Sequence, residues 1–198
     1  MVDENKQEKT WSPSYLREPQ LLLRATAFHE AGHAVVGYRY GKFVRDNGIR
    51  IDFIRPGLGN CHTRGEYLFP LQQVGDSMMR GAQVKRLRSE CIESLAGHAA
   101  EFRAMAIRKW VTLECPDTRR ALELIKSVRE CGEQTAMLEL EWTYVPATRR
   151  MVRDQAIWQG IETVAKELLK ADGFLSSDKA NSILENTGVI QVSPTYWR

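Results

Sequence analysis

The chain has few cysteines, and their spacing follows no pattern. Its 198 residues contain no C-x-x-C, and the cysteines are Cys61, Cys91, Cys115 and Cys131. A disulfide framework of the kind found in small secreted domains has more regular cysteine usage. We therefore expect reduced thiols and a cytoplasmic location.

Long apolar runs are also lacking. The N-terminal "MVDENKQEKT" is polar and has no apolar core of the kind found in signal peptides. The most apolar window, residues 21–40, contains Arg24, and a central arginine costs about 2.5–3.5 kcal/mol on membrane-insertion scales. We expect a soluble protein with no membrane partner.

Neither sign of charge dominates the sequence. The net charge is only +3, and the basic pairs Arg119–Arg120 and Arg149–Arg150 have acidic residues near them. No basic stripe is interleaved with aromatic residues, which is the pattern typical of nucleic-acid binding. We interpret the basic pairs as solvated helix faces and expect no nucleic-acid partner.

Hydrophobic periodicity predicts a mainly α domain with a small β-hairpin. Alternation in "IRIDFI" (49–54) indicates a half-buried strand, which "CHTRGEY" (61–67) can pair with after a turn. "RDNG" (45–48) is expected to form a turn before the first strand. The expected helices span 21–42, 74–110, 116–140, 147–170, and a last segment from a cap at Ser176 or Ser177 to Glu185. We expect a flexible arm over 1–19, one domain over 20–190 and a tail over 191–198.

The first helix contains the most informative motif, "FHEAGHAVV" (28–36). His29 and His33 lie four residues apart and share one face of a helix, so both imidazoles can point at one metal ion. Glu30 is offset by about a third of a turn, where its carboxylate can reach water at the metal. Short patterns also arise by chance, but these polar groups in an apolar helix are costly without partners. Gly32, in mid-helix, suggests a close packing contact.

Three segments in order, "FHEAGHAVV", "SLAGHAAEF" (94–102) and "CPDTRRALELIKSV" (115–128), resemble the peptidase domain of the FtsH-type ATP-dependent zinc metalloproteases. The segments at 49–67 and 162–185 also look like that family's strand pair and closing helices. The resemblance covers about residues 20–186. It implies a helical metallopeptidase domain with a small sheet beside the active-site cleft.

The resemblance implies a zinc site in which the three ligands and the catalytic base can each be assigned to a residue of this chain. His29, His33 and Asp117 are the expected zinc ligands, and Glu30 is the expected catalytic base. Asp117 also suits a plain helix-start acid, a role compatible with ligation. Glu101 is either a rival third ligand or the partner of a ligand histidine's far nitrogen.

His98 departs from the pattern, because the family usually has arginine there; we interpret it as a packed or half-exposed side chain. His62 beside Cys61 does not have the spacing of a second metal site. The small residues Ala96, Gly97, Ala99 and Ala100 are expected to pack closely against Ala31 and Gly32.

No G-x-x-x-x-G-K-[ST] occurs, so we expect no ATPase activity in this chain. The expected function is a zinc endopeptidase that cuts flexible or unfolded polypeptides, with a separate unfoldase or adaptor as a possible partner. Homo-oligomers, including a hexamer, are open. The alternative is a non-catalytic, zinc-stabilised interaction or regulatory module. An extended substrate is expected to add as a strand along 49–54.

Overall fold

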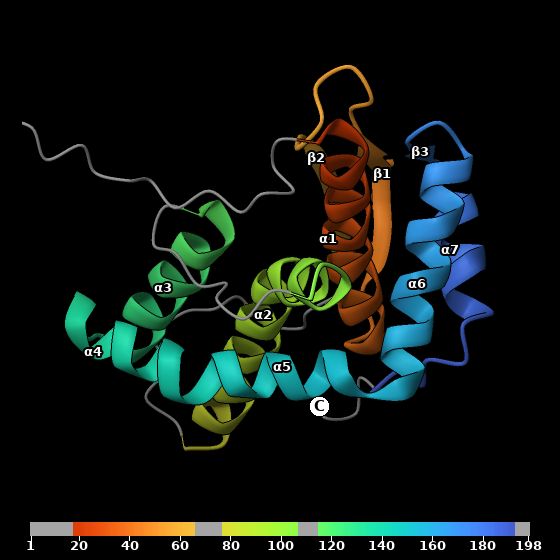
Figure 1. Cartoon of the computed structure of the whole chain (residues 1–198). Coiled ribbons are helices and arrows are strands. Elements are labelled where there is room, and N and C mark those ends of the chain that lie inside the picture. Colours follow the sequence, from red (N-terminus) through yellow and green to blue (C-terminus); the bar gives the residue numbers. More distant parts are fainter. Residues whose placement is uncertain (1–17, 66–76, 107–114, 193–198) are drawn as a thin grey trace, which may run out of the picture.

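A central helix organises the structure, a computed structural model that describes residues 18–65, 77–106 and 115–192. Helix α1 is packed by α2, by α6 and by a small antiparallel sheet, while α3 and α4 lie beyond α2 (Figure 1). The elements in order are α1 (Pro19–Arg39), β1 (Phe43–Ile51), β2 (Gly59–Arg64), α2 (Ser77–Ala104), α3 (Pro116–Arg129), α4 (Glu133–Glu139), the π-helix η2 (Leu140–Tyr144), α5 (Val145–Arg153), α6 (Gln155–Lys170), β3 (Phe174–Leu175) and α7 (Ser177–Glu185). The expected mainly helical fold with a small β element is confirmed.

Helix α1 is buried on nearly every side, as its sequence predicts. Pro19 stands in its first turn, where the missing N–H costs nothing, and Gly41 follows its end with a φ of 74°. The small side chains of Ala27, Ala31 and Ala34 are fully buried, so neighbouring elements approach the helix closely. This central position places the His29–His33 face inside the molecule.

The crossing of α1 and α2 depends on small residues. A Cβ atom at Gly32 would lie 2.6 Å from the Ala96 carbonyl oxygen and 2.9 Å from the Ala100 Cβ. Real Cβ atoms do not come that close to backbone, so any side chain at Gly32 would push the two helices apart. The expected close contact between these helices is confirmed, and it fixes the helix that carries the histidines.

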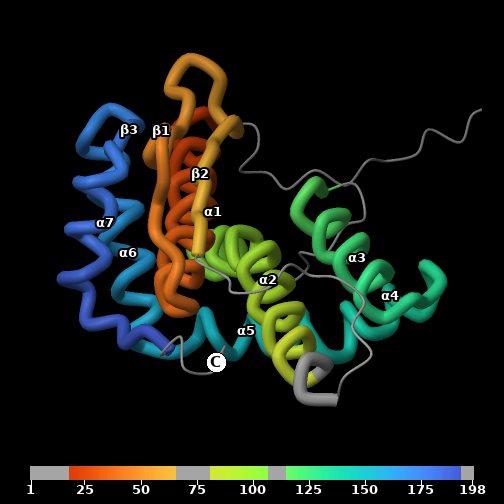
Figure 2. The backbone as a smooth tube through the Cα atoms, turned by 180° about the vertical axis from the view of Figure 1, so that it is seen from behind, coloured from red at the N-terminus to blue at the C-terminus, as the bar shows by residue number. Residues whose placement is uncertain are grey.

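The sheet has the order β2-β1-β3 and is antiparallel throughout. β1 and β2 form the expected hairpin, with Ile49 opposite Cys61, and they lie along α1 (Figure 2). Ile49 is also opposite Leu175 of β3, a strand that was not predicted. Because both edges of β1 are covered there, the hypothesis that a substrate strand adds along 49–54 is wrong.

The predicted turn at 45–48 is instead a bulge inside β1. The pairing register shifts between Val44 and Ile49, and Asp46 and Gly48 adopt φ values of 49° and 68°. A Cβ at Gly48 would lie 2.0 Å from the Leu175 carbonyl oxygen, so only glycine lets β3 approach at this point. The "DNG" residues permit the backbone to bend, as predicted, but they bend a strand rather than end one.

Two predicted helices are divided, and one predicted break is absent. Glu130 is left-handed with a φ of 50° and separates α3 from α4, and Asp154 separates α5 from α6 by capping the latter. By contrast, "TYVP" does not interrupt the helix. The π-helical η2 runs directly into α5, and Pro146 stands in the first turn of α5. Ser176 caps α7 as expected.

The chain ends are only partly described. Residues 1–17 of the predicted arm and 193–198 of the predicted tail lie outside the described residues, as do 107–110 of the predicted second helix. Near the tail, the Val192 amide donates to the Arg39 carbonyl at the end of α1. Over the parts that are described, none of the helices has the length and apolarity needed to cross a membrane.

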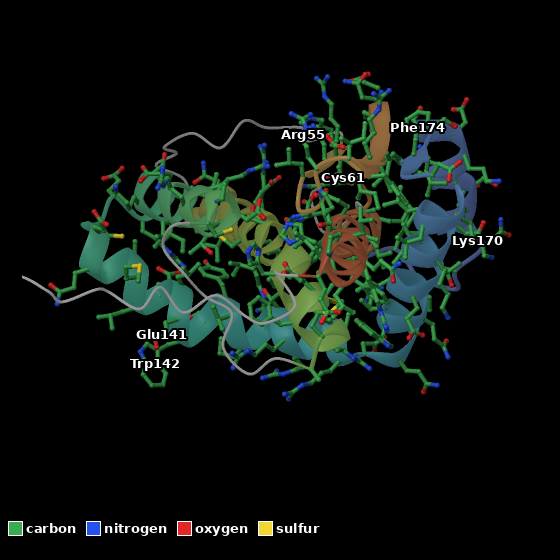
Figure 3. The ribbon with its side chains drawn as sticks, turned by 45° about the horizontal axis from the view of Figure 1, so that its top comes forward. Arg55, Cys61, Glu141, Trp142, Lys170 and Phe174 are labelled. Carbon is green, nitrogen blue, oxygen red and sulfur yellow. The ribbon has the colours of Figure 1, made fainter. Side chains whose placement is uncertain are left out.

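A view toward the end of α1 separates the interior of the fold from its surface. Cys61 of β2 lies over the central helix and is partly buried, whereas Trp142 of η2 projects away from the body of the molecule (Figure 3). The side of the sheet that faces α1 therefore lies within the core, and the candidate site is built beside it.

Candidate metal centre

Three side chains from two distant segments converge on one point between α1, α2 and the start of α3. His29 Nε2 lies 3.1 Å from Asp117 Oδ2, and His33 Nε2 lies 3.4 Å from the same oxygen. The two Nε2 atoms are 3.2 Å apart. The structure thus brings together the three residues that the sequence predicts as zinc ligands, although 88 residues separate His29 from Asp117.

These separations match those of a tetrahedral zinc site. With zinc–nitrogen bonds of about 2.0–2.1 Å, neighbouring ligand atoms of a tetrahedron lie about 3.3–3.4 Å apart. The three observed edges of 3.1, 3.2 and 3.4 Å therefore leave room at their centre for one ion at ordinary bond lengths. The donor set of two imidazoles and one carboxylate is also one that zinc accepts.

The far nitrogen of each α1 histidine has its own partner. His33 Nδ1 lies 2.8 Å from the Glu93 carbonyl oxygen, which can only accept, so this nitrogen carries the proton. His29 Nδ1 lies 3.1 Å from Glu101 Oε2. Both contacts favour the tautomer with a bare Nε2, the form that binds a metal. Of its two predicted roles, Glu101 thus has the position required of a partner for the far nitrogen of His29.

The converging atoms are acceptors that repel one another unless a cation or protons lie between them. Burial lowers the pKa of His29, but hydrogen bonds to Asp117 and Glu101 outweigh burial and raise that pKa to about 10. Burial would raise the pKa of Asp117, but hydrogen bonds with His29, His33 and His98 hold it far below its usual range. Without a metal, protonated imidazoles therefore pair with the Asp117 carboxylate.

Asp117 owes its position to the start of α3. Pro116 stands in the first turn of that helix, and Asp117 follows it, where the helix dipole favours a carboxylate. The plain helix-start role and a ligand role are therefore both satisfied by one placement. The packing of α3 against α2 then places the Asp117 carboxylate next to the histidines.

Glu30 lies beside the converging atoms and not among them. Its side chain is buried, and a Cβ at Gly59 of β2 would lie 2.4 Å from Glu30 Oε1. Burial raises the pKa of Glu30, and the nearby charges of His29 and His33 partly offset that rise. A carboxylate whose pKa is raised is a stronger proton acceptor in its ionised form than an ordinary carboxylate.

Two further residues at the centre were not predicted to be there. His98 Nδ1 lies 3.5 Å from Asp117 Oδ2, and the ligand-type atoms of His29, His98 and Asp117 all lie within 4.8 Å of one another. This group is close enough to hold a metal ion. Burial lowers the pKa of His98, but its bonds to Asp117 and Cys115 raise it to about 9. The interpretation of His98 as a packing residue is incomplete.

Gly97 is the second unexpected member. A Cβ there would lie 2.4 Å from His33 Nε2 and 2.7 Å from His29 Nε2, so glycine keeps open the space that a metal requires. Glu93, Gly97 and Glu101 recur every four residues and therefore share one face of α2. That spacing is a signal in the sequence that would have placed all three beside α1.

Removal of the Glu101 charge is expected to weaken zinc binding without disturbing the fold. Glu101→Gln keeps the size of the side chain but replaces the carboxylate that orients His29, and loss of such a partner typically costs about 10- to 100-fold in metal affinity. Competition with a chromogenic chelator measures this change. Glu185→Gln, at an exposed position on α7, is the control. Equal affinity in the two variants would contradict the proposed orienting role.

The remaining histidine lies outside the converging ligand atoms, although its charge helps to lower the pKa of Glu30. His62 lies exposed on β2, and among the described residues it belongs to no group of side chains spaced to hold a metal ion.

Comparison with known proteins does not assign a function to this centre. No protein-family model matches the chain, and no curated protein matches it. The functional interpretation therefore depends on the residues of the centre themselves.

Proposed function

We propose that the protein is a zinc-dependent endopeptidase of the kind found in FtsH-type peptidase domains. The observation that carries the proposal is the convergence of His29, His33 and Asp117 at tetrahedral spacing, with the buried carboxylate of Glu30 beside them. A purely structural metal site would have no use for that additional carboxylate.

In the proposed reaction, His29 Nε2, His33 Nε2 and Asp117 Oδ2 hold the ion. When bound, zinc supplies Lewis acidity toward water and toward a peptide carbonyl. Glu30 accepts a proton from the attacking water at its carboxylate and then delivers it to the leaving amine, the two tasks of one general acid–base residue. Glu101 and the Glu93 carbonyl keep the two imidazoles fixed during these steps.

The sheet suggests where a substrate lies. Within the described residues, β2 is an edge strand, since the order is β2-β1-β3. Gly59 of β2 lies directly against Glu30. An extended polypeptide added along β2 would run past the base, and main-chain hydrogen bonds would supply affinity without demanding a particular sequence. Flexible or unfolded segments are thus the proposed substrates, delivered where necessary by a separate unfoldase.

A non-catalytic, zinc-stabilised interaction module is the second candidate. The observation that favours it is His98, whose ligand-type atom lies within 4.8 Å of those of His29 and Asp117, near the position that a catalytic zinc keeps for water. The presence of Glu30 argues against it, because a metal site that only stabilises the fold does not need a proton acceptor.

Glu30→Gln separates the two candidates. The variant is expected to bind about one zinc ion, as the wild type does, and to lose about 10²- to 10⁴-fold in the rate of casein cleavage, because an amide cannot accept the proton. Zinc content is measured by elemental analysis after gel filtration, and cleavage by the release of acid-soluble peptides. Zinc binding without casein cleavage, in the wild type and in His98→Gln alike, would favour the interaction module.

A further inference from the structure

His98 is placed like a metal ligand and not like a packing residue. Its Nδ1 is one of three ring nitrogens near Asp117 Oδ2, and their distances to that oxygen are 3.1, 3.4 and 3.5 Å for His29, His33 and His98. All three are close to the tetrahedral edge of about 3.3–3.4 Å that zinc bonds imply. By its distance to Asp117, His98 resembles the two α1 histidines, and its ligand-type atom also lies within 4.8 Å of that of His29.

The surroundings of His98 direct it inward. Its side chain is only 16% exposed, and its ring meets the ring of His29 edge-on, with centroids 4.6 Å apart. Phe102, one turn along α2, stacks on the other side at 6.4 Å. The imidazole is thus held between an aromatic ring and the metal centre, with Nδ1 directed toward the centre.

His98 also has a second partner outside the centre. Cys115 Sγ lies 3.6 Å from His98 Nδ1 and 4.0 Å from Asp117 Oδ2. A thiol is a weak hydrogen-bond donor, so Cys115 can hold Nδ1 when that nitrogen is not bound to a metal. A small movement of the ring therefore exchanges one partner for the other.

We infer that His98 binds the same zinc ion through Nδ1 as a fourth protein ligand, closing the site in the resting protein. Zinc sites with four protein ligands are closed, whereas catalytic sites leave one position for water. Water would then reach the zinc only when His98 moves toward Cys115, so the resting enzyme is latent. This inference depends on the proposed zinc site, but its test does not depend on peptidase activity.

Histidine coordination can be observed directly, because the chain contains only four histidines. In long-range proton–nitrogen correlation spectra of nitrogen-labelled, zinc-loaded wild type, His29 and His33 should each show a metal-bound Nε2 and a proton on Nδ1. His98 should show the reverse pattern, a metal-bound Nδ1 with the proton on Nε2. His62, which is exposed on β2, gives the signal of an imidazole without metal. A wild-type spectrum in which His98 matches His62 would overturn the inference.

The variant His98→Gln tests the consequence. It should retain zinc, lose only the reversed set of signals and cleave casein faster than wild type, since the fourth position is now open to water. Circular dichroism confirms that the variant is folded, and the wild-type spectrum decides the coordination whether it folds or not. Slower cleavage by a folded, zinc-loaded His98→Gln would contradict latency.

The two proposals can fail separately. Three metal-bound imidazoles without cleavage by wild type or by His98→Gln would support the fourth ligand and refute the peptidase. Two metal-bound imidazoles in a protein that cleaves casein would support the peptidase and refute the fourth ligand.

Discussion

Gly97→Ala is expected to abolish zinc binding while leaving most of the fold intact. The added methyl group would lie 2.4 Å from His33 Nε2 and 2.7 Å from His29 Nε2, which is inside the space where the ion must make its bonds. Neither imidazole can retreat easily, because Glu93 and Glu101 hold their far nitrogens. Isothermal titration with zinc should show no binding in the micromolar range, and casein cleavage should be lost with it.

Gly81→Ala is the matched control, since it makes the same substitution in the same helix. Nothing lies within 4 Å of a Cβ built at Gly81, which is exposed on α2. Alanine there should bind zinc like wild type and stabilise the helix by about 0.5–1 kcal/mol, because glycine loses more backbone entropy on folding. Tight zinc binding by Gly97→Ala would show that the metal does not lie between the two Nε2 atoms.

Local sequence signals predicted the helix that carries the histidines and the small residues that pack on it, but not the third residue of the centre. The spacing of His29 and His33 is a property of any α-helix, and it was sufficient to predict a shared face. The placement of Asp117 came only from the resemblance, because no local rule relates residues so far apart in the chain. Its position in the structure comes from the packing of α3 on α2, which depends on the whole fold.

The missed members of the centre have a common cause. By residue type, Gly97 is a small packing residue and His98 a lone histidine, whereas the role of each follows from its position on α2 beside α1 and Asp117. The bulge at Asp46 was missed for a similar reason. Turn-forming residues indicate where the backbone can bend, but the partner strand determines whether the bend ends a strand or distorts it.

Whether a helix breaks also depends on both local and tertiary causes. Asp154 carries a local signal, a side chain that caps α6, and the chain bends there. Pro146 carries an equally strong local signal, yet the helix runs through it, because the π-helical turn before it relieves the clash that proline normally causes. Sequence alone does not reveal which of these two outcomes a given breaker will have.

A buried ion-pair cluster beside the metal centre leads to the second large prediction. Lys42, the residue before β1, is almost completely buried, and its Nζ lies 2.9 Å from Glu90 Oε1 and also bonds Glu93 Oε2. Thr63 of β2 donates to the other Glu93 oxygen. The cluster joins the sheet to α2 at the residue whose carbonyl oxygen accepts the His33 proton.

Lys42→Ala should therefore destabilise the protein by about 3–5 kcal/mol, because it removes the buried cation from Glu93 and leaves Glu90 with the exposed Arg120, whose Nη2 lies 3.8 Å from Glu90 Oε2. For a chain of this size the melting temperature should fall by roughly 6–20 °C. Lys166→Ala, at an exposed position on α6, should change stability by less than about 0.5 kcal/mol. Urea unfolding followed by circular dichroism measures both variants.

Lys42→Met distinguishes the loss of charge from the loss of packing. Methionine keeps most of the aliphatic stem, so a destabilisation close to that of Lys42→Ala assigns the effect to the ammonium group. Because Glu93 also holds His33, zinc affinity should fall together with stability in both variants. A stable Lys42→Met with weakened zinc binding would mean that the cluster serves the metal centre more than the fold. A stable variant with wild-type affinity would mean that the two carboxylates tolerate burial without the lysine.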